Sequence, residues 1–228
     1  MFAPQDFFDL NDEPLAELFT DCVNVWDVLK NLPQLVQNLT AEPVILGEVH
    51  PTAVLSGPVY VGENSIIGPH VHIRGPVYIG KNTELRHGAY LRENTIVSDG
   101  CVVGHDSETK GSIMLKNSHA PHFAYVGDSI LGRGVNLGAG TKLANFKLEG
   151  NEVFIQLEDQ RISTGLRKLG AIIGDGVSIG CNAVTAPGTL IGKNSWIYSL
   201  ISLRGVIPAD SIIKPATGYT VTQKRKGS

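Results

Sequence analysis

Hydrophobic residues recur every six positions through the middle of the chain, and a small or β-branched residue stands four places after almost every one of them. A fixed short period of this kind is typical of a β-solenoid, in which each repeat forms one short strand and a corner. Three repeats close a triangular coil of about 18 residues, and both positions of each repeat are expected to face its interior. The aliphatic positions are Val49, Leu55, Val61, Ile67, Ile73, Ile79, Leu85, Leu91, Val97 and Val103.

The period is interrupted twice after Val103. The interval between Leu115 and Leu131 is 16 residues and not 18, and residues 146–170 are too long and too polar to form a corner. We expect this second stretch to leave the coil as an excursion such as a hairpin, and loops of this length are often functional. The repeat resumes at Ile173, so the sequence predicts a mainly β solenoid domain over residues 43–214.

Residues 1–42 follow a different pattern. The stretch VNVWDVLKNLPQLVQNL places apolar residues close to helical spacing, which predicts a short N-terminal helical segment. Pro33 is expected to break or restart this helix. Trp26 and the leucines need burial, so the segment should pack either on the solenoid or on a neighbouring subunit. Residues 215–228 are expected to form a charged C-terminal tail.

Composition excludes several classes of protein. The 19 Lys and Arg residues against 22 Asp and Glu residues give a net charge of −3, which argues against a general nucleic-acid binder. Cys22, Cys101 and Cys181 lie far apart without metal-ligand spacing, so neither a disulfide framework nor a zinc site is predicted. The acidic N-terminus is unlike a signal peptide, and no apolar run is long enough to span a membrane. A soluble protein of the reducing cytoplasm fits best.

Basic residues repeat at the period of the coil. Arg74, Arg92 and Lys110 are each 18 positions apart, so they should stack about 4.8 Å from one another along one edge of the prism. Three like charges in a column repel one another unless an anion or carboxylates lie among them. The column is therefore interpreted either as an anion-binding site or as a solvated charged face.

Histidines form a second column. His70, His87, His105 and His122 are separated by 17 or 18 positions. Three interpretations remain open: surface histidines without a role, a metal site that bridges subunits, or His122 as a general base with the other histidines lining a cleft. Because no carboxylate or further histidine has clear ligand spacing, no metal is assigned.

The segment HFAYVGDSILGRGVNLGAGTKLAN resembles the acetyltransferase domain of the bifunctional glucosamine-1-phosphate N-acetyltransferase and uridylyltransferase family. The resemblance covers about residues 45–214 and implies a left-handed parallel β-helix, acetyl-CoA as acyl donor, no metal for acetyl transfer, and homotrimers with the site between subunits. Outward-facing Tyr90, Ile96 and Val102 are candidates for the trimer contacts.

Read onto this sequence, the resemblance makes His122 the general base. It makes Tyr125 a sugar-phosphate contact and Asn136 and Asn145 further substrate contacts. The family's phosphate-binding arginine and lysine fall on Arg92 and Lys110, two members of the column found by spacing alone, which favours the anion-site interpretation.

The donor site is less closely matched. Cys181, Ser199, Arg204 and Lys214 are the candidates for contacts with acetyl-CoA, although Cys181 stands where the bacterial family often has serine. The excursion carrying Arg167 and Lys168 replaces a shorter loop whose lysine those enzymes use. In this it resembles the archaeal-type members of the family.

The resemblance predicts an acetyl-CoA-dependent N-acetyltransferase acting on an aminosugar phosphate such as glucosamine 1-phosphate. No nucleotidyltransferase half is matched, so uridylyl transfer is not expected. Two alternatives remain: an acyltransferase acting on another phosphorylated or nucleotide-linked aminosugar, and a non-catalytic trimeric partner of a separate sugar-phosphate nucleotidyltransferase. Neither nucleic acid nor membrane is an expected partner.

Overall fold

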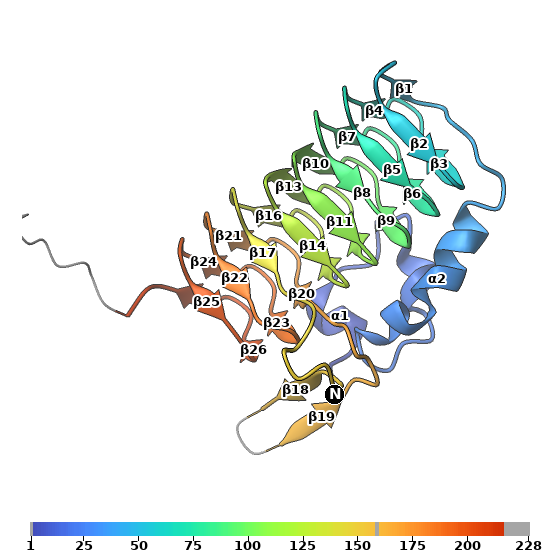
Figure 1. The fold of residues 1–228 in the computed structure, drawn as a ribbon. Helices are drawn as coiled ribbons and strands as arrows, with labels where there is room; N and C mark the ends of the chain where they lie inside the picture. Colours follow the sequence, from blue (N-terminus) through green and yellow to red (C-terminus); the bar gives the residue numbers. More distant parts are fainter. Residues whose placement is uncertain (1, 158–159, 217–228) are drawn as a thin grey trace, which may run out of the picture.

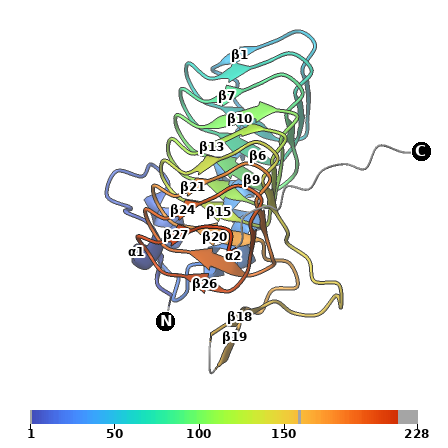
Figure 2. The same cartoon turned by 90° about the vertical axis from the view of Figure 1, so that its left-hand side faces the viewer.

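The main body of the protein is a left-handed parallel β-helix with a triangular cross-section (Figures 1 and 2). The computed structural model describes residues 2–157 and 160–216. From Val61 to Val103, every aliphatic position of the six-residue period is buried inside the prism. Val49 and Leu55 are partly exposed, because they lie in the first coil and have a neighbouring coil on one side only. The predicted solenoid and its inward pattern are confirmed.

Each side of the prism is a parallel sheet, and the chain visits the three sides in the same order in every coil. Face 1 contains β1 (Glu48–Val49), β4 (Ile66–Ile67), β7 (Glu84–Leu85), β10 (Val102–His105), β13 (His119–His122), β16 (Asn136–Leu137), β21 (Ser178–Ile179), β24 (Trp196–Ile197) and β27 (Ile212–Ile213). Face 2 contains β2 (Val54–Ser56), β5 (His72–Arg74), β8 (Tyr90–Leu91), β11 (Glu108–Lys110), β14 (Tyr125–Gly127), β17 (Lys142–Leu143), β22 (Val184–Thr185) and β25 (Ser202–Leu203). Face 3 contains β3 (Val59–Val61), β6 (Val77–Ile79), β9 (Thr95–Val97), β12 (Ile113–Met114), β15 (Ile130–Leu131), β20 (Ala171–Ile173), β23 (Thr189–Ile191) and β26 (Val206–Ile207).

The corners between faces need backbone conformations that few residues adopt. The corner between faces 1 and 2, called corner 1–2 here, has a residue with positive φ in successive coils, among them Gly88 (73°), Asp106 (49°) and Asn182 (54°). Gly, Asn and Asp tolerate this left-handed region best, which explains their place in the repeat. The corner between faces 2 and 3 is called corner 2–3.

The coils shorten where the sequence period slips. Met114 pairs with Leu131, an interval of 17 residues, and Met114 is the side chain that faces the interior. Leu115, which the six-residue count places inside, faces outward into a second hydrophobic core. The interval of 16 that was predicted between Leu115 and Leu131 is therefore wrong by one residue. The coil shortens in the corner before β12, and because Met114 and Leu115 are both apolar, the sequence does not show which of them faces inward.

The N-terminal segment covers face 3. It contains α1 (Pro4–Phe7), the 3-10 helix η1 (Ala16–Phe19) and α2 (Asp27–Leu39), and Figure 1 shows α2 beside the coils. Trp26 and Leu32 are buried in the second core together with Ile96. The outward contact predicted for Ile96 is thus made within the chain, and Ile96 is not available to a neighbouring subunit.

The predicted break at Pro33 is wrong. Helix α2 continues through this residue. Pro33 lies on the exposed side of the helix, where water can replace the backbone hydrogen bond that proline cannot make.

The segment between β17 and β20 leaves the coils (Figures 1 and 2). It contains an antiparallel pair, β18 (Phe154–Gln156) and β19 (Arg161–Ser163), and Val153 and Ile155 are buried in the second core. No helix in the described part of the chain has the length and apolarity needed to cross a membrane. The tail expected over residues 215–228 lies largely outside the described residues.

Candidate functional site

Four of the predicted site residues line one cavity at corner 2–3. Arg92, Lys110, Tyr125 and Asn145 surround a space of about 330 Å³, together with Phe146 and Lys168. Arg92 follows β8 and Lys110 ends β11 at the same edge of face 2, so the coil period itself brings them together. The excursion supplies Phe146 and Lys168 from the other side. Of the two loop cations considered from sequence, Lys168 is the one at this cavity.

A glycine allows two of these side chains to meet. The Nδ2 group of Asn145 donates to the Tyr125 hydroxyl at 3.3 Å, across the backbone of Gly127. A Cβ atom at residue 127 would meet both the Tyr125 oxygen and Asn145 Nδ2 at 2.6 Å. Gly127 is therefore required for the Tyr125–Asn145 contact.

Carboxylates accompany the basic column. Arg74 pairs with Glu93 at 2.7 Å, Arg92 with Glu108 at 3.0 Å, and Lys110 with Asp128 at 3.2 Å. The expected repulsion among three unpaired cations is thus absent, since the column is a set of ion pairs. An anion bound here would share these cations with the carboxylates.

Arg92 and Lys110 nevertheless differ from Arg74. The Arg74 side chain is about half exposed, whereas those of Arg92 and Lys110 are 29% and 17% exposed and line the cavity. Nε of Arg92 is buried and, among the residues that the structure describes, has no hydrogen-bond acceptor. The guanidinium group therefore keeps donor capacity that Glu108 does not use.

Electrostatics keep Arg92 charged and Tyr125 neutral. The hydrogen bond to Glu108 raises the pKa of Arg92 above its usual value. Burial raises the pKa of Tyr125, the nearby Glu108 carboxylate adds to the increase, and the hydrogen bond from Asn145 opposes it. Near neutral pH the phenol therefore keeps its proton. Its oxygen already accepts from Asn145, so the hydroxyl hydrogen can be donated to a ligand.

His122 lies at the opposite edge of face 2, at corner 1–2, and its side chain is exposed. It is only three positions from Tyr125 in the chain, which limits the distance between their Cα atoms to at most ~11 Å. The predicted base and the cationic cavity thus occupy two ends of one face.

Corner 1–2 also carries part of the predicted donor site. Backbone hydrogen bonds stack equivalent positions of successive coils: Gly140 N–H donates to the His122 carbonyl at 3.0 Å, and Asn182 N–H to the Ala139 carbonyl at 2.8 Å. Cys181 therefore lies two coils from His122, roughly 10 Å along the same edge. Exposed Ser199 follows in the next coil.

Three further predicted residues lie neither at the Arg92 and Lys110 cavity nor beside His122 and Cys181 within one chain. Asn136 is on face 1, where it aligns with His119 and Ser178. Lys214 lies beyond the last strand of face 1, with its Nζ 5.5 Å from the centre of the Tyr198 ring. Arg204 is at corner 2–3, in a separate cavity of about 320 Å³ that Lys147, Phe154 and Arg161 also line.

Sequence reasoning missed Asp128 and Phe146. Asp128 bonds to both Lys110 and Asn145, and it follows Lys110 by 18 positions, so a search for opposite charges at the coil period would have found it. Phe146 has no such signal, because it begins the excursion where the period stops.

The chain has relatives among known proteins. Residues 73–162 match the family model described as the GMPPB C-terminal domain. The chain is 36% identical over 208 residues to the bifunctional protein GlmU of Methanococcus aeolicus, an alignment that covers 91% of this chain and 50% of that protein. It is 42% identical over 153 residues to a bifunctional sugar-1-phosphate nucleotidylyltransferase/acetyltransferase of Sulfurisphaera tokodaii, which covers 67% and 38% of the two chains.

This chain resembles the acetyltransferase-like domain of GlmU. It spans about half the length of the GlmU relative from Methanococcus aeolicus. A structure of a UDP-N-acetylglucosamine acyltransferase from Campylobacter jejuni aligns with a TM-score of 0.53 at 16% identity, covering 72% of this chain and 70% of that one. At that identity the likeness concerns the fold alone. The resemblance to GlmU and the β-helix expected from it are confirmed.

Proposed function

We propose that the protein transfers an acetyl group from acetyl-CoA to the amine of an aminosugar phosphate such as glucosamine 1-phosphate. The observation that carries this proposal is the convergence of Arg92, Lys110, Tyr125 and Asn145 on one cavity, at the end of the face whose other edge holds His122. The name of the Sulfurisphaera relative, which joins sugar-1-phosphate chemistry to acetyl transfer, supports the same class of acceptor.

In this proposal the cavity at corner 2–3 grips the phosphate. Arg92 and Lys110 provide charge-assisted hydrogen bonds, and the Tyr125 hydroxyl donates a further one. Glu108 and Asp128 hold the two cations in place and lower the net positive charge of the cavity. Lys168 supplies a third cation from the excursion.

His122 acts on the amine at the other end of the sugar. The amine arrives protonated, and the imidazole takes one proton so that the nitrogen lone pair can attack the thioester carbonyl. The new C–N bond forms as the C–S bond breaks, and the proton held by the imidazole passes to the departing thiolate. The attacking nitrogen releases its second surplus proton to water, which leaves a neutral amide. Holding the phosphate at a fixed place on face 2 orients the amine for this attack.

The donor is proposed to lie along corner 1–2, below His122. Cys181 and Ser199 follow His122 along this edge, and Lys214 is the cation expected at its far end. Arg204 lines the separate cavity at corner 2–3 that Lys147 and Arg161 also line, so its assignment to acetyl-CoA requires the phosphates of the donor to reach that cavity. Acetyl-CoA is a substrate here, and the proposed acetyl transfer uses no metal.

A homotrimer would complete the site. Asn136 lies on face 1, away from the cavity of its own chain, so we assign it to the site of a neighbouring subunit. Tyr90 and Val102 are partly exposed on faces 2 and 1 and remain candidates for subunit contacts. A separate nucleotidyltransferase partner and a cytoplasmic location are part of the same proposal.

The base assignment is tested with His122→Ala. Release of CoA thiol from acetyl-CoA is measured in the presence of glucosamine 1-phosphate, and kcat is expected to fall on the order of 10²–10⁴-fold. His50→Ala, which changes an exposed histidine in the first coil, is the control and should stay near the unsubstituted rate. Activity of His122→Ala within a few fold of the unsubstituted protein would show that another group is the base.

A further inference from the structure

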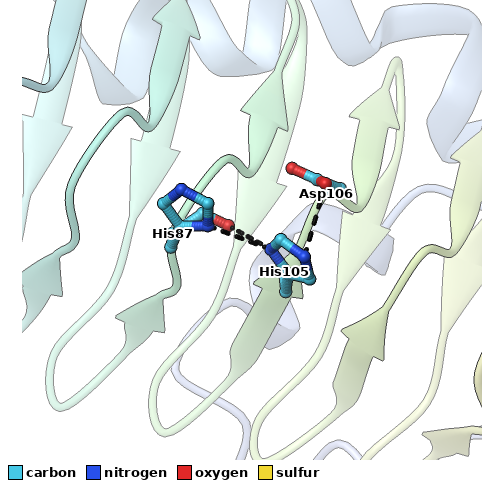
Figure 3. A group of neighbouring side chains, drawn as sticks. All are labelled: His87, His105 and Asp106. Atoms are coloured by element: carbon cyan, nitrogen blue, oxygen red, sulfur yellow. Dashed lines mark hydrogen bonds and ion pairs between the residues drawn. The ribbon is translucent and has the colours of Figure 1, made fainter.

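Three metal-ligating side chains converge at corner 1–2, one coil before His122 (Figure 3). They are His87, His105 and Asp106, and each places one ligand atom within 4.8 Å of those of the others. Nδ1 of His87 is 3.1 Å from Nδ1 of His105. The opposite ring nitrogen of His105, Nε2, is 3.4 Å from Oδ2 of Asp106, and a single ion would use only one of these two nitrogens. Figure 3 shows the two imidazoles side by side with the carboxylate beyond His105.

We propose that His87, His105 and Asp106 bind a divalent transition-metal ion such as Zn²⁺. Two imidazoles and one carboxylate are a donor set that suits Zn²⁺, Co²⁺ or Ni²⁺ and does not suit Mg²⁺ or Ca²⁺, which prefer oxygen ligands. Two ligands bound at 2.0–2.1 Å in a tetrahedral site lie about 3.3 Å apart. The two Nδ1 atoms are already near that separation.

Backbone hydrogen bonds align these residues in successive coils. Asp106 N–H donates to the His87 carbonyl at 3.4 Å, and Phe123 N–H donates to the His105 carbonyl at 2.9 Å. The Phe123 ring packs edge-on against His105, with the ring centres 5.0 Å apart. This contact restricts the side chain of His105 before an ion binds.

Asp106 reaches the histidines because of the corner geometry. Its backbone has a positive φ of 49°, and its carboxylate lies over Gly88 in the preceding coil, where a Cβ atom would collide with Oδ1. No metal was predicted from the sequence, because no carboxylate or further histidine has clear ligand spacing to the histidine column. Asp106 is the immediate neighbour of His105, and only the left-handed turn brings its side chain back toward His87.

The site leaves room for further ligands. Three protein ligands around a tetrahedral ion leave one position for water or for another side chain. The His70 ring stands edge-on to that of His87, with the centres 5.7 Å apart, and is the nearest further imidazole on that side. This inference stands on the side-chain cluster alone and does not depend on the proposed acetyl transfer.

Isothermal titration of the metal-free full chain with Zn²⁺ tests the proposal. We expect one ion per chain, and Co²⁺ in its place should give the visible absorption of a tetrahedral site. His87→Gln and His105→Gln should each weaken binding by at least roughly tenfold, since changes outside the ligand set already cost 10–100-fold. His50→Gln, at an exposed histidine outside the cluster, is the matched control and should bind as the unsubstituted protein does.

Asp106→Asn removes the carboxylate and keeps a residue that suits the left-handed turn. Asparagine tolerates a positive φ, and Asn182 already lies over Gly140 at the same corner as Asp106 lies over Gly88. This variant should fold normally, as judged by thermal unfolding without metal, and should bind Zn²⁺ more weakly. Absence of Zn²⁺ binding to the unsubstituted chain, or binding that survives unchanged in both His87→Gln and His105→Gln, would overturn the proposal.

Discussion

Replacing Gly127 by alanine tests the phosphate cavity without removing any polar group. Residue 127 has no positive φ, so the backbone accepts alanine, and the strain falls on the side chains around the new methyl group. The Cβ atom would lie 2.6 Å from both the Tyr125 oxygen and Asn145 Nδ2. Opening these contacts from 2.6 Å to the 3.4 Å of ordinary packing displaces the pair by about 0.8 Å.

This displacement acts on binding more than on folding. A misplacement of about 1 Å can lower catalytic efficiency on the order of 100-fold, so we expect kcat/KM for glucosamine 1-phosphate to fall roughly 10–100-fold. Overpacking of this size costs about 1–3 kcal/mol of stability, which thermal unfolding would detect. The KM for acetyl-CoA should change little, because the donor is proposed to lie along the other edge of the face.

Steady-state release of CoA thiol, measured with each substrate varied in turn, provides the assay. Gly62→Ala is the control, since its Cβ atom would also meet a neighbouring atom at 2.6 Å but in an early coil far from the cavity. It should lower stability without a selective rise in the KM for the acceptor. If Gly127→Ala folds and keeps its kcat/KM for glucosamine 1-phosphate, Tyr125 and Asn145 do not bind the acceptor.

Three further predictions concern single side chains. Lys110→Met should raise the KM for glucosamine 1-phosphate roughly 10–100-fold, as expected for a charge-assisted hydrogen bond of about 1.5–3 kcal/mol, and an unchanged KM would remove Lys110 from the phosphate site. Burial raises the pKa of Tyr78 to about 12, so between pH 10 and that value the unfolded chain loses the phenol proton before the folded chain does, and stability falls as pH rises. Tyr78→Phe should make this decline less steep when urea unfolding midpoints are measured across this pH range. Equal slopes for the variant and the unsubstituted protein would contradict the prediction. Iodoacetamide should modify the exposed Cys181, and more slowly when acetyl-CoA is present. Cys101 is buried, and burial raises its pKa to about 12, so its thiol should resist the reagent. Labelling of Cys101 in the native protein, detected by mass spectrometry, would contradict the packing.

The repeat made most of the fold predictable, because inward and outward positions in a solenoid differ in polarity at every turn. The prediction went wrong where polarity carries no information. Met114 and Leu115 are both apolar, so the sequence does not reveal which one faces the prism interior and which faces the second core. Ile96 looked like a subunit contact for a similar reason, since an outward apolar residue does not show whether its cover comes from the same chain.

The site was predictable to the extent that it follows the coil period. Arg92 and Lys110 were found by spacing, and the structure places them at one cavity. Glu108 was not found, since it reaches Arg92 from a strand of the next coil, 16 positions away. Asp106 was not predicted as a metal ligand, because its proximity to His87 depends on one backbone turn and not on spacing in the sequence.

The central claim is most directly tested by measuring CoA thiol release from acetyl-CoA by the purified chain with glucosamine 1-phosphate or glucosamine as acceptor. The proposed site predicts saturable release with glucosamine 1-phosphate and a kcat/KM for glucosamine lower by at least roughly tenfold, because glucosamine has no phosphate for Arg92 and Lys110 to bind. Equal rates with both acceptors, or no release with either, would contradict the proposal that this chain acetylates a sugar phosphate held at corner 2–3.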